Sequence, residues 1–489
     1  MNIKTRFSTL ITLAALAAAL LAGRGTARAA GVEPPDTPAG RQFAAWLAAF
    51  NSGDRETLRQ FTAKNRPQAL PRLDGMMEFR ERTGGFDLLK VEQSTPTHLR
   101  GIVKERKSDM YGRVEFEVDA AEPHLVTGLS IEMIPAPPDL KAAAPPPVLT
   151  PRMTQSDALA AFRAEIDKRV AEDRFAGAAL IAKDGKPVFD QAYGLANREQ
   201  KTPNTLDTKF RLGSMNKMFT AVSILQLAQA GKIDLNAPVG RYLTDYPNKD
   251  LARATIHQLL THTGGAGDVF GPEFDAHRQD LRTPADFVKL YGERGPRYEP
   301  GAKWEYSNYG FVLLGAVIER VSGQSYYDYV DQHVFKPAGM TSTGSRPENE
   351  NVPQRSTGYM KAEGSSTLIP NTDGLPYRGM PAGGGYSTVG DLLRFAAALQ
   401  NHKLLNAEYT DLLTTGKVDT PFGTRYAYGF RDSIINGVRC FGHSGGAPGM
   451  NGDLQICPAS GYVVAILANL DPFAAEDLTR FILPRLPEK

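Results

Sequence analysis

Residues 135–151 contain seven prolines, and this stretch strongly limits how the chain can fold. Proline fixes its own φ and has no backbone N–H, so a segment this rich in proline continues neither a helix nor the interior of a sheet. Such a composition favours a stiff, extended linker. We therefore expect two separate folding units, residues 35–134 and residues 152–489.

The first unit has the pattern of a small α+β domain. Phe43–Phe50 has helical periodicity that stops at Gly53, and a second short helix is expected from Asp54. Gly112–Asp119 and Gly128–Ile134 then alternate apolar and polar residues, as strands do. This order and the "FNSGD" punctuation resemble the cone-shaped nuclear-transport-factor-like domains. The resemblance leaves two roles open, a ligand-holding cone or a spacer and dimerisation module without catalysis.

Residues 1–29 have the three parts of a secretory signal peptide. Basic residues precede the apolar run Leu10–Ala22, and Ala27–Ala29 provides a small-residue cleavage site, so cleavage is predicted before Ala30. The apolar run is shorter than the ~20 residues that span a bilayer. We expect a periplasmic or secreted protein with no integral membrane span in the mature chain.

The signal segment carries four basic and no acidic residues, so its removal changes the formal net charge from +2 to −2. Nucleic-acid binding is therefore not expected. In an oxidising compartment the two cysteines, Cys440 and Cys457, could form a disulfide if a hairpin centred near Pro448 and Gly449 joins them. Two buried free thiols are the alternative.

The second unit is predicted to contain an antiparallel sheet built from both of its ends. Gly177–Tyr193 reads as a hairpin with its turn at Asp184-Gly185. Gly452–Cys457 and Gly461–Ala468 are strand-like, and a last helix is expected from Ala474. The sequence between these β regions is mostly helical. The predicted class is α+β, with an all-helical region inserted into the sheet.

Ser214 opens an apolar helix that is expected to run to about Ala230, and Lys217 follows one helical turn later. Residues three apart share a helix face, so the Lys217 amine can lie beside the Ser214 hydroxyl. Burial would make Lys217 easier to deprotonate and thus able to activate that hydroxyl. The free N–H groups of the helix N-terminus would face developing negative charge.

Ser444 is a second candidate nucleophile, because Gly442-x-Ser444-x-Gly446 matches the nucleophile elbow of lipases. An elbow needs a following helix and a later histidine. The glycines and proline after Ser444 cannot open a stable helix, and no histidine follows His443. Ser444 is therefore not expected to attack the substrate.

Three motifs follow one another in the second unit: S-x-x-K at Ser214, Y-x-N at Tyr306 and H-x-G at His443. In this order, and over about residues 156–485, they resemble the serine β-lactamase and penicillin-binding protein superfamily in its class C branch. The resemblance implies a β-lactamase/D,D-peptidase-like catalytic domain. It also matches Leu259–Gly265 to the family's "LLTHTGG" loop, whose role is structural.

Two further stretches repeat motif patterns. Tyr246-Pro-Asn248 has the Y-x-N pattern, but its polar surroundings and its proline predict a surface turn. His262-Thr-Gly264 has the H-x-G pattern but directly follows the helical stretch Ile256–Leu260. The H-x-G at His443 instead follows a strand-like stretch, Ser433–Phe441, as the edge strand of the family does.

The resemblance implies a role for each residue of the motifs. Ser214 would attack, with Lys217 and Tyr306 exchanging its proton, and Tyr306 or His443 would activate the water that releases the acyl group. Asn308 would donate hydrogen bonds to the substrate and to Lys217. The substrate and oxyanion side would consist of Asn308, His443, Ser444 with its hydroxyl toward the substrate or Lys217, Gly445 for close approach, and the N–H groups of Gly446 and Ser214.

His443 departs from the lysine that most β-lactamases carry at this position. An imidazole is mostly neutral at neutral pH, so strong β-lactamase activity is not expected. Arg439 or Arg425 could supply the missing positive charge for a substrate carboxylate. The sequence thus predicts an exported serine hydrolase of the esterase or D-amino-acid peptidase type, or a weak β-lactamase. The alternative is a penicillin-recognising binding module that acylates with little turnover.

The expected substrate is a small molecule or peptide with an ester, amide or lactam carbonyl. No cofactor and no metal is expected, because the eight histidines form no H-x-H or H-x-x-x-H pair and two cysteines are too few for a zinc site.

Overall fold

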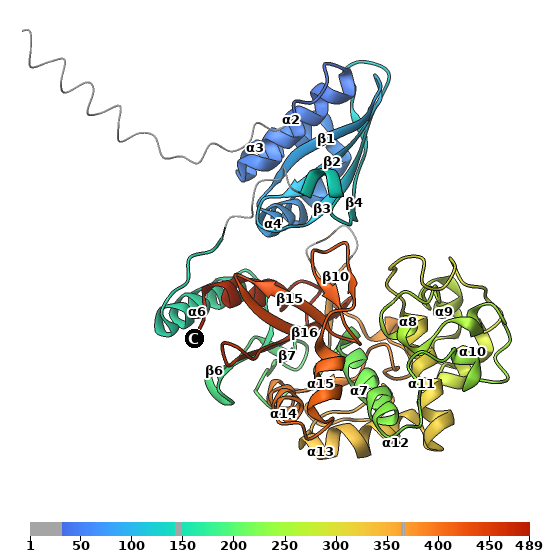
Figure 1. The fold of residues 1–489 in the computed structure, drawn as a ribbon. Helices are drawn as coiled ribbons and strands as arrows, with labels where there is room; N and C mark the ends of the chain where they lie inside the picture. The colour runs from blue at the N-terminus through green and yellow to red at the C-terminus, as the bar shows by residue number, and fades with distance from the viewer. Residues whose placement is uncertain (1–31, 142–148, 363–364, 366) are drawn as a thin grey trace, which may run out of the picture. The chain divides into compact units, whose positions relative to one another are not determined.

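The structure is a computed structural model that describes residues 32–141, 149–362, 365 and 367–489. The predicted signal peptide lies outside these residues, as does part of the predicted linker. The described chain forms two compact units, one of residues up to Leu70 and from Phe79 to Pro147, the other of Pro71–Glu78 and Val148–Lys489 (Figure 1). No helix among the described residues is long and apolar enough to cross a membrane.

The N-terminal unit contains helices and one antiparallel sheet, as the sequence predicts. The sheet has the order β1-β2-β3-β4. The elements of this part of the chain are α2 Pro38–Ser52, α3 Arg55–Asn65, η1 Pro67–Arg72, α4 Leu73–Thr83, β1 Phe86–Ser94, β2 His98–Glu105, β3 Tyr111–Val118 and β4 Val126–Ile134. Of these, the residues Pro71–Glu78 in η1 and α4 count with the other unit. Helix α2 begins at an N-cap, Thr37, and ends at left-handed Gly53, which explains the predicted stop. The likeness to nuclear-transport-factor domains stays a prediction.

The linker is not extended throughout, contrary to the prediction. Pro138–Lys141 forms one helical turn, α5. Proline at the first helical position loses no intrahelical hydrogen bond, and Asp139 in the first turn complements the helix dipole. The proline-rich composition therefore permits a helix start, although it forbids a helix interior.

The second unit is built on an eight-stranded sheet in which both ends of the domain meet, as predicted. Its order is β13-β14-β15-β16-β17-β18-β5-β6, and antiparallel pairing of β18 with β5 joins the end of the domain to its beginning. The strands are β5 Gly177–Lys183, β6 Lys186–Tyr193, β13 Val418–Asp419, β14 Arg425–Tyr426, β15 Arg431–Ile435, β16 Val438–Ala447, β17 Met450–Cys457 and β18 Tyr462–Ala468. The β5–β6 turn is Asp184-Gly185, with positive φ at both residues.

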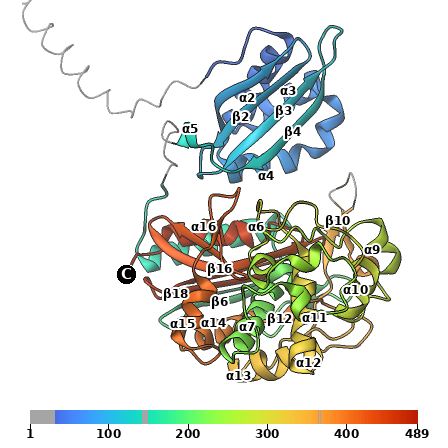
Figure 2. The ribbon, with the colours of Figure 1, turned by 45° about the vertical axis from the view of Figure 1, so that its right-hand side comes forward.

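Helices cover both faces of this sheet. Figure 2 shows α6 Gln155–Ala171 and α16 Glu476–Ile482 on one face, with α7 Asn216–Gln229 and α14 Val389–Gln400 on the other. The remaining helices are α8 Ile256–Leu260, α9 Pro272–His277, α10 Pro284–Tyr291, α11 Asn308–Ser322, α12 Tyr326–Val330, α13 Lys336–Ala338 and α15 Ala407–Thr414. Most side chains of α7 are buried, so this helix lies in the core, and the polar Lys217 is among its buried residues.

We expected Ser433–Phe441 to form one strand-like stretch, but the structure divides it between two strands. It divides between β15 and β16 at Asn436-Gly437, where both residues have positive φ. Asn-Gly is a strong signal for a two-residue hairpin turn, and it was present in the sequence. The division matters because it leaves the second half of β16, from His443 onward, unpaired with β15.

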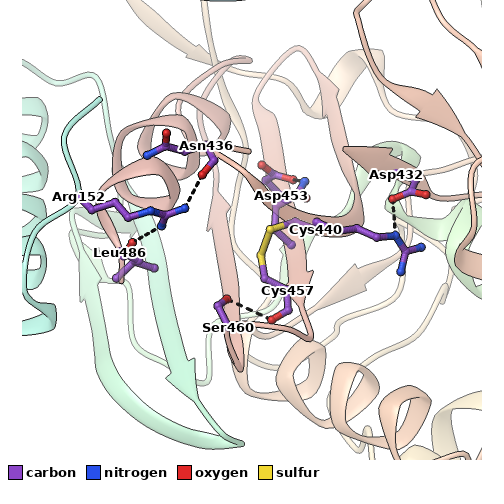
Figure 3. The surroundings of a disulfide bond; sticks show 10 residues. Arg152, Asp432, Asn436, Cys440, Asp453, Cys457, Ser460 and Leu486 are labelled. Atoms are coloured by element: carbon purple, nitrogen blue, oxygen red, sulfur yellow. Dashed lines mark hydrogen bonds and ion pairs between the residues drawn. A yellow bond between two sulfur atoms is a disulfide. The ribbon is translucent and has the colours of Figure 1, made fainter. Parts of the chain in front are cut away.

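Cys440 and Cys457 are bonded to each other, so the structure contains the disulfide and not the two free thiols that the sequence left open as an alternative. Strands β16 and β17 form a hairpin around Pro448-Gly449, in which Phe441 pairs with Ile456. This register places Cys440 beside Cys457, and a disulfide links them (Figure 3). The bond ties together the two central strands three residues before His443.

Candidate active site

Ser214 and Lys217 meet where a short strand enters the central helix. Strand β9 Phe210–Arg211 leads into the 3₁₀ turn Gly213–Met215, and α7 follows directly. Nζ of Lys217 lies 3.2 Å from Oγ of Ser214. The predicted serine–lysine pair is thus formed by one turn of helical backbone, with the lysine side chain fully buried.

The amine of Lys217 has three oxygen atoms within hydrogen-bonding distance. Nζ donates to Oδ1 of Asn308 over 2.7 Å and to the carbonyl oxygen of Ala382 over 2.6 Å. The third contact, with Oγ of Ser214 at 3.2 Å, also has Nζ as the donor, and it is the one that the lone pair of a deprotonated amine would replace. Burial lowers the pKa of Lys217 well below its usual value, and no ion pair of this lysine is found among the described residues.

Tyr306 and Asn308 stand on either side of the start of α11. Ser307 caps the helix, because its hydroxyl accepts from the N–H of Gly310 over 2.9 Å. Burial raises the pKa of Tyr306 to about 12, although a hydrogen bond with Ser214 opposes the shift. The phenol is therefore protonated at neutral pH and suits a proton donor better than a resting base.

Asn308 was predicted to donate a hydrogen bond to Lys217, but in the structure it accepts one from Lys217. Its Oδ1 accepts from the lysine, while its Nδ2 donates to both carboxylate oxygens of Asp268 over 3.0 and 3.1 Å. Asp268 fixes the orientation of the amide, because a carboxylate accepts and cannot donate. No sequence motif pointed to Asp268, which lies 40 residues before Asn308 in an irregular segment.

His443 is a buried imidazole with both nitrogens occupied. Nδ1 donates to the carbonyl oxygen of Ser444 over 2.5 Å, and Nε2 accepts from the Tyr426 hydroxyl over 2.9 Å. Burial lowers the pKa of His443 well below its usual value, with the neighbouring Arg431 charge acting in the same direction. The imidazole is thus neutral, and its one basic nitrogen already has a proton donor. The suggestion that His443 activates water does not agree with this arrangement.

Ser444 does not contact Lys217, contrary to one expected role. Its Oγ accepts from Nη1 of Arg431 over 3.2 Å. Arg439 and Arg425, the two arginines proposed from the sequence, bond to other residues. Arg439 pairs with Asp432, and Arg425 lies near Asp419. No carboxylate partner within ion-pair distance of Arg431 is found in the described parts of the chain. Strand β15 supplies this cation because it turns back beside β16.

The glycines of β16 let the strand touch the backbone of the serine turn. A Cβ on Gly445 would lie 1.9 Å from the Leu212 carbonyl oxygen and 2.8 Å from the Ser214 nitrogen. A Cβ on Gly213 would lie 2.7 Å from the Gly446 nitrogen. The amides of Ser214 and Gly446 are therefore neighbours, as a two-donor oxyanion site requires.

The two stretches that repeat motif patterns, at Tyr246 and His262, are both buried but lie in different surroundings. Tyr246 was predicted to lie in a surface turn, but it is buried in the core, with its hydroxyl 3.1 Å from that of Tyr309. His262 follows α8 as expected, yet its ring lies against Tyr306 with centroids 4.3 Å apart. Among the described residues, no group of three or more His, Cys, Asp or Glu could hold a metal ion.

Comparison with known proteins places this geometry in a family. Residues 162–486 match the family model described as Beta-lactamase. The protein PbpX of Bacillus subtilis (strain 168), which bears the name of a penicillin-binding protein, is 33% identical over 305 residues, covering 62% of this chain and 72% of that protein. Esterase EstB of Burkholderia gladioli is 33% identical over 231 residues, covering 44% of this chain and 54% of the esterase.

A solved structure of a D-stereospecific amidohydrolase from Streptomyces sp. is also similar. It has a TM-score of 0.57 and 30% sequence identity, and the match covers 66% of this chain and 97% of that one. The similarity thus extends over nearly the whole amidohydrolase but over about half of the esterase.

Proposed function

Because the chain belongs to the β-lactamase family and is a serine hydrolase of that family, we propose that it hydrolyses its substrate through an acyl-enzyme on Ser214. The observation that carries this proposal is the Lys217 amine, buried, hydrogen-bonded to two obligate acceptors and 3.2 Å from the Ser214 hydroxyl. A buried amine in this state is a base placed on one particular serine.

In the first half-reaction, Oγ of Ser214 forms a bond to the substrate carbonyl carbon while its proton passes to Nζ of Lys217. The carbonyl π electrons move to oxygen, where the Ser214 and Gly446 amides stabilise the charge, each donor contributing on the order of 3 kcal/mol. The leaving group departs with its bonding electrons and takes the proton of the Tyr306 hydroxyl. Tyr306 regains a proton from the lysine, which returns to its neutral form.

The second half-reaction is the reverse, with water in place of the leaving group. Tyr306 first passes its proton to Lys217, and its phenolate then accepts a proton from the water as the water oxygen bonds to the acyl carbon. The bond between the acyl carbon and Oγ of Ser214 breaks, and Oγ takes the proton of the lysine, which returns to its neutral form. His443 takes no proton in either step, because both of its nitrogens are engaged. Its role in the proposal is to shape the substrate side of the cleft.

The proposed substrates are esters and amides of D-amino acids or small D-peptides, with lactams as weaker substrates. The names of the related esterase and of the D-stereospecific amidohydrolase support this range. Arg431, hydrogen-bonded to Ser444, is the cation proposed to bind a substrate carboxylate. We propose that this activity belongs to the periplasm or to the outside of the cell. The signal peptide predicted from the sequence supports this location, and the Cys440–Cys457 disulfide would persist there.

The test is intact-protein mass spectrometry after treatment with a fluorophosphonate and, separately, with a penicillin. Wild type is compared with Ser214→Ala and with Ser444→Ala as the matched serine control. The proposal expects a fluorophosphonate adduct that Ser214→Ala abolishes and Ser444→Ala retains. An adduct lost only in Ser444→Ala would contradict it, and a penicillin adduct that persists without hydrolysis of any ester or amide would favour a penicillin-recognising binding module instead.

A further inference from the structure

His262 lies beside the proposed catalytic tyrosine although it belongs to none of the three motifs. Its side chain is 1% exposed, and its ring centroid is 4.3 Å from that of Tyr306 and 4.5 Å from that of Tyr426. Phe311, on α11, packs on it at 5.1 Å. The imidazole therefore fills the space behind the Tyr306 ring.

His262 also holds the backbone on both sides of Tyr306. Its Nδ1 accepts from the N–H of Ser307 over 3.1 Å. Its carbonyl oxygen accepts from the N–H of Glu305 over 3.0 Å. The residues immediately before and after Tyr306 are thus fixed by one histidine, and the bond to Ser307 also fixes the approach to Asn308, one residue further on.

Two features of His262 are unfavourable for folding. Its φ is +61°, in the left-handed region that residues with a Cβ seldom occupy. Since Nδ1 accepts a hydrogen bond, the proton of the neutral ring is on Nε2, and this buried N–H has no hydrogen-bond partner among the described residues. A residue that only filled space would need neither the strained backbone nor the unpaired donor, and such features concentrate at functional sites.

We infer that His262 is a positioning residue, whose Nδ1 acceptor, more than its ring, holds the Tyr306 hydroxyl toward Ser214 for proton transfer. The inference rests on the proposed function, because it assigns Tyr306 a proton to deliver. A histidine that only anchored its loop would affect stability without selectively affecting the chemical step. We therefore assign His262 more than a structural role in this loop.

The experiment separates the two parts of His262 with two variants. His262→Phe keeps a ring against Tyr306 but removes the acceptor for the Ser307 N–H. His262→Asn restores an acceptor near the Nδ1 position and tolerates positive φ, but removes the ring. His257→Phe is the matched control, because His257 lies on α8 only five residues earlier and bonds Tyr428, a residue of none of the three motifs, over 2.8 Å.

The measurements are kcat and KM for an activated ester, the rate of fluorophosphonate labelling, and thermal unfolding. His262→Phe is expected to lower kcat by up to about 100-fold with little change in KM, since a misplaced catalytic group loses rate on this scale. His262→Asn is expected to recover most of that loss, and His257→Phe to keep the wild-type kcat. Equal losses in His262→Phe and His262→Asn, or an unchanged kcat in folded His262→Phe, would overturn the inference.

A measurement on the wild-type chain keeps the inference testable if a variant fails to fold. Nitrogen NMR of histidine-labelled protein should show His262 as the neutral tautomer with its proton on Nε2. A proton on Nδ1 would exclude the bond to Ser307 and with it the inference. The proposed function fails separately, when Ser214→Ala still forms the adduct, so the two failures are distinguishable.

Discussion

The Tyr426 hydroxyl donates a hydrogen bond to Nε2 of His443 over 2.9 Å, and both side chains are buried. This contact fixes the imidazole as a neutral acceptor at the position where a lysine would bring a positive charge. Burial also raises the pKa of Tyr426 well above its usual value, so the phenol keeps its proton and remains the donor. The substrate side of β16 is thus uncharged at His443 itself.

Tyr426→Phe should leave Nε2 of His443 buried without a donor. An unsatisfied buried acceptor costs about 1–3 kcal/mol, and we expect the free energy of unfolding to fall by that amount. Chemical denaturation of the variant and of wild type measures the difference. Because Nε2 then becomes free to take up a proton, activity at acidic pH should also change. Identical stability and an identical pH profile would show that the hydrogen bond does not form.

Arg431→Gln should selectively impair substrates that carry a carboxylate. A hydrogen bond to a charged group is worth about 1.5–3 kcal/mol, so we expect kcat/KM for a D-peptide with a free carboxylate to fall about 10- to 100-fold. An ester without a carboxylate should be hydrolysed as before. Arg425→Gln is the control, because Arg425 is exposed near Asp419 and should affect neither substrate. Equal effects of the two variants would refute the assignment.

Asp453→Asn should stabilise the protein at neutral pH. Burial raises the pKa of Asp453 from 3.8 to about 6, so the folded state binds a proton more tightly than the unfolded state does. The stability this group contributes is present below pH 3.8 and is lost as pH rises through about 6. Asparagine cannot ionise, so the variant should gain up to about 3 kcal/mol at pH 7.5 and little at pH 4. Unfolding curves at both pH values test the sign, and a gain of equal size at both would exclude this cause.

Gly445→Ala should disrupt the contact between β16 and the serine turn. The added Cβ would overlap the Leu212 carbonyl oxygen at 1.9 Å, and neither backbone can move without displacing Ser214. We expect a loss of about 3 kcal/mol in stability and of fluorophosphonate labelling. Gly374→Ala is the control, because its Cβ would meet no atom within 4 Å. Wild-type labelling of a folded Gly445→Ala variant would contradict the close approach.

Part of the fold followed from the sequence, because local patterns determine local structure. The period of two and the turn residues predicted β5 and β6 at their observed bounds, and Ser214 and Lys217 lie together because one helical turn brings them there. The single strand assumed for Ser433–Phe441 was wrong although its Asn-Gly turn was visible. The depth of Tyr246 could not be predicted, since burial depends on packing between distant segments.

The sequence by itself determined the order of the three motifs and the helical spacing of Ser214 and Lys217. It predicted the hairpin around Pro448 and Gly449 but left the pairing of the cysteines open. The tertiary structure alone decided which residues complete the site. Asp268, Arg431, Tyr426 and His262 contact the motif residues from irregular segments or other strands. Their positions depend on long-range packing, whereas helical periodicity, strand alternation and turn chemistry act only between near neighbours in the chain.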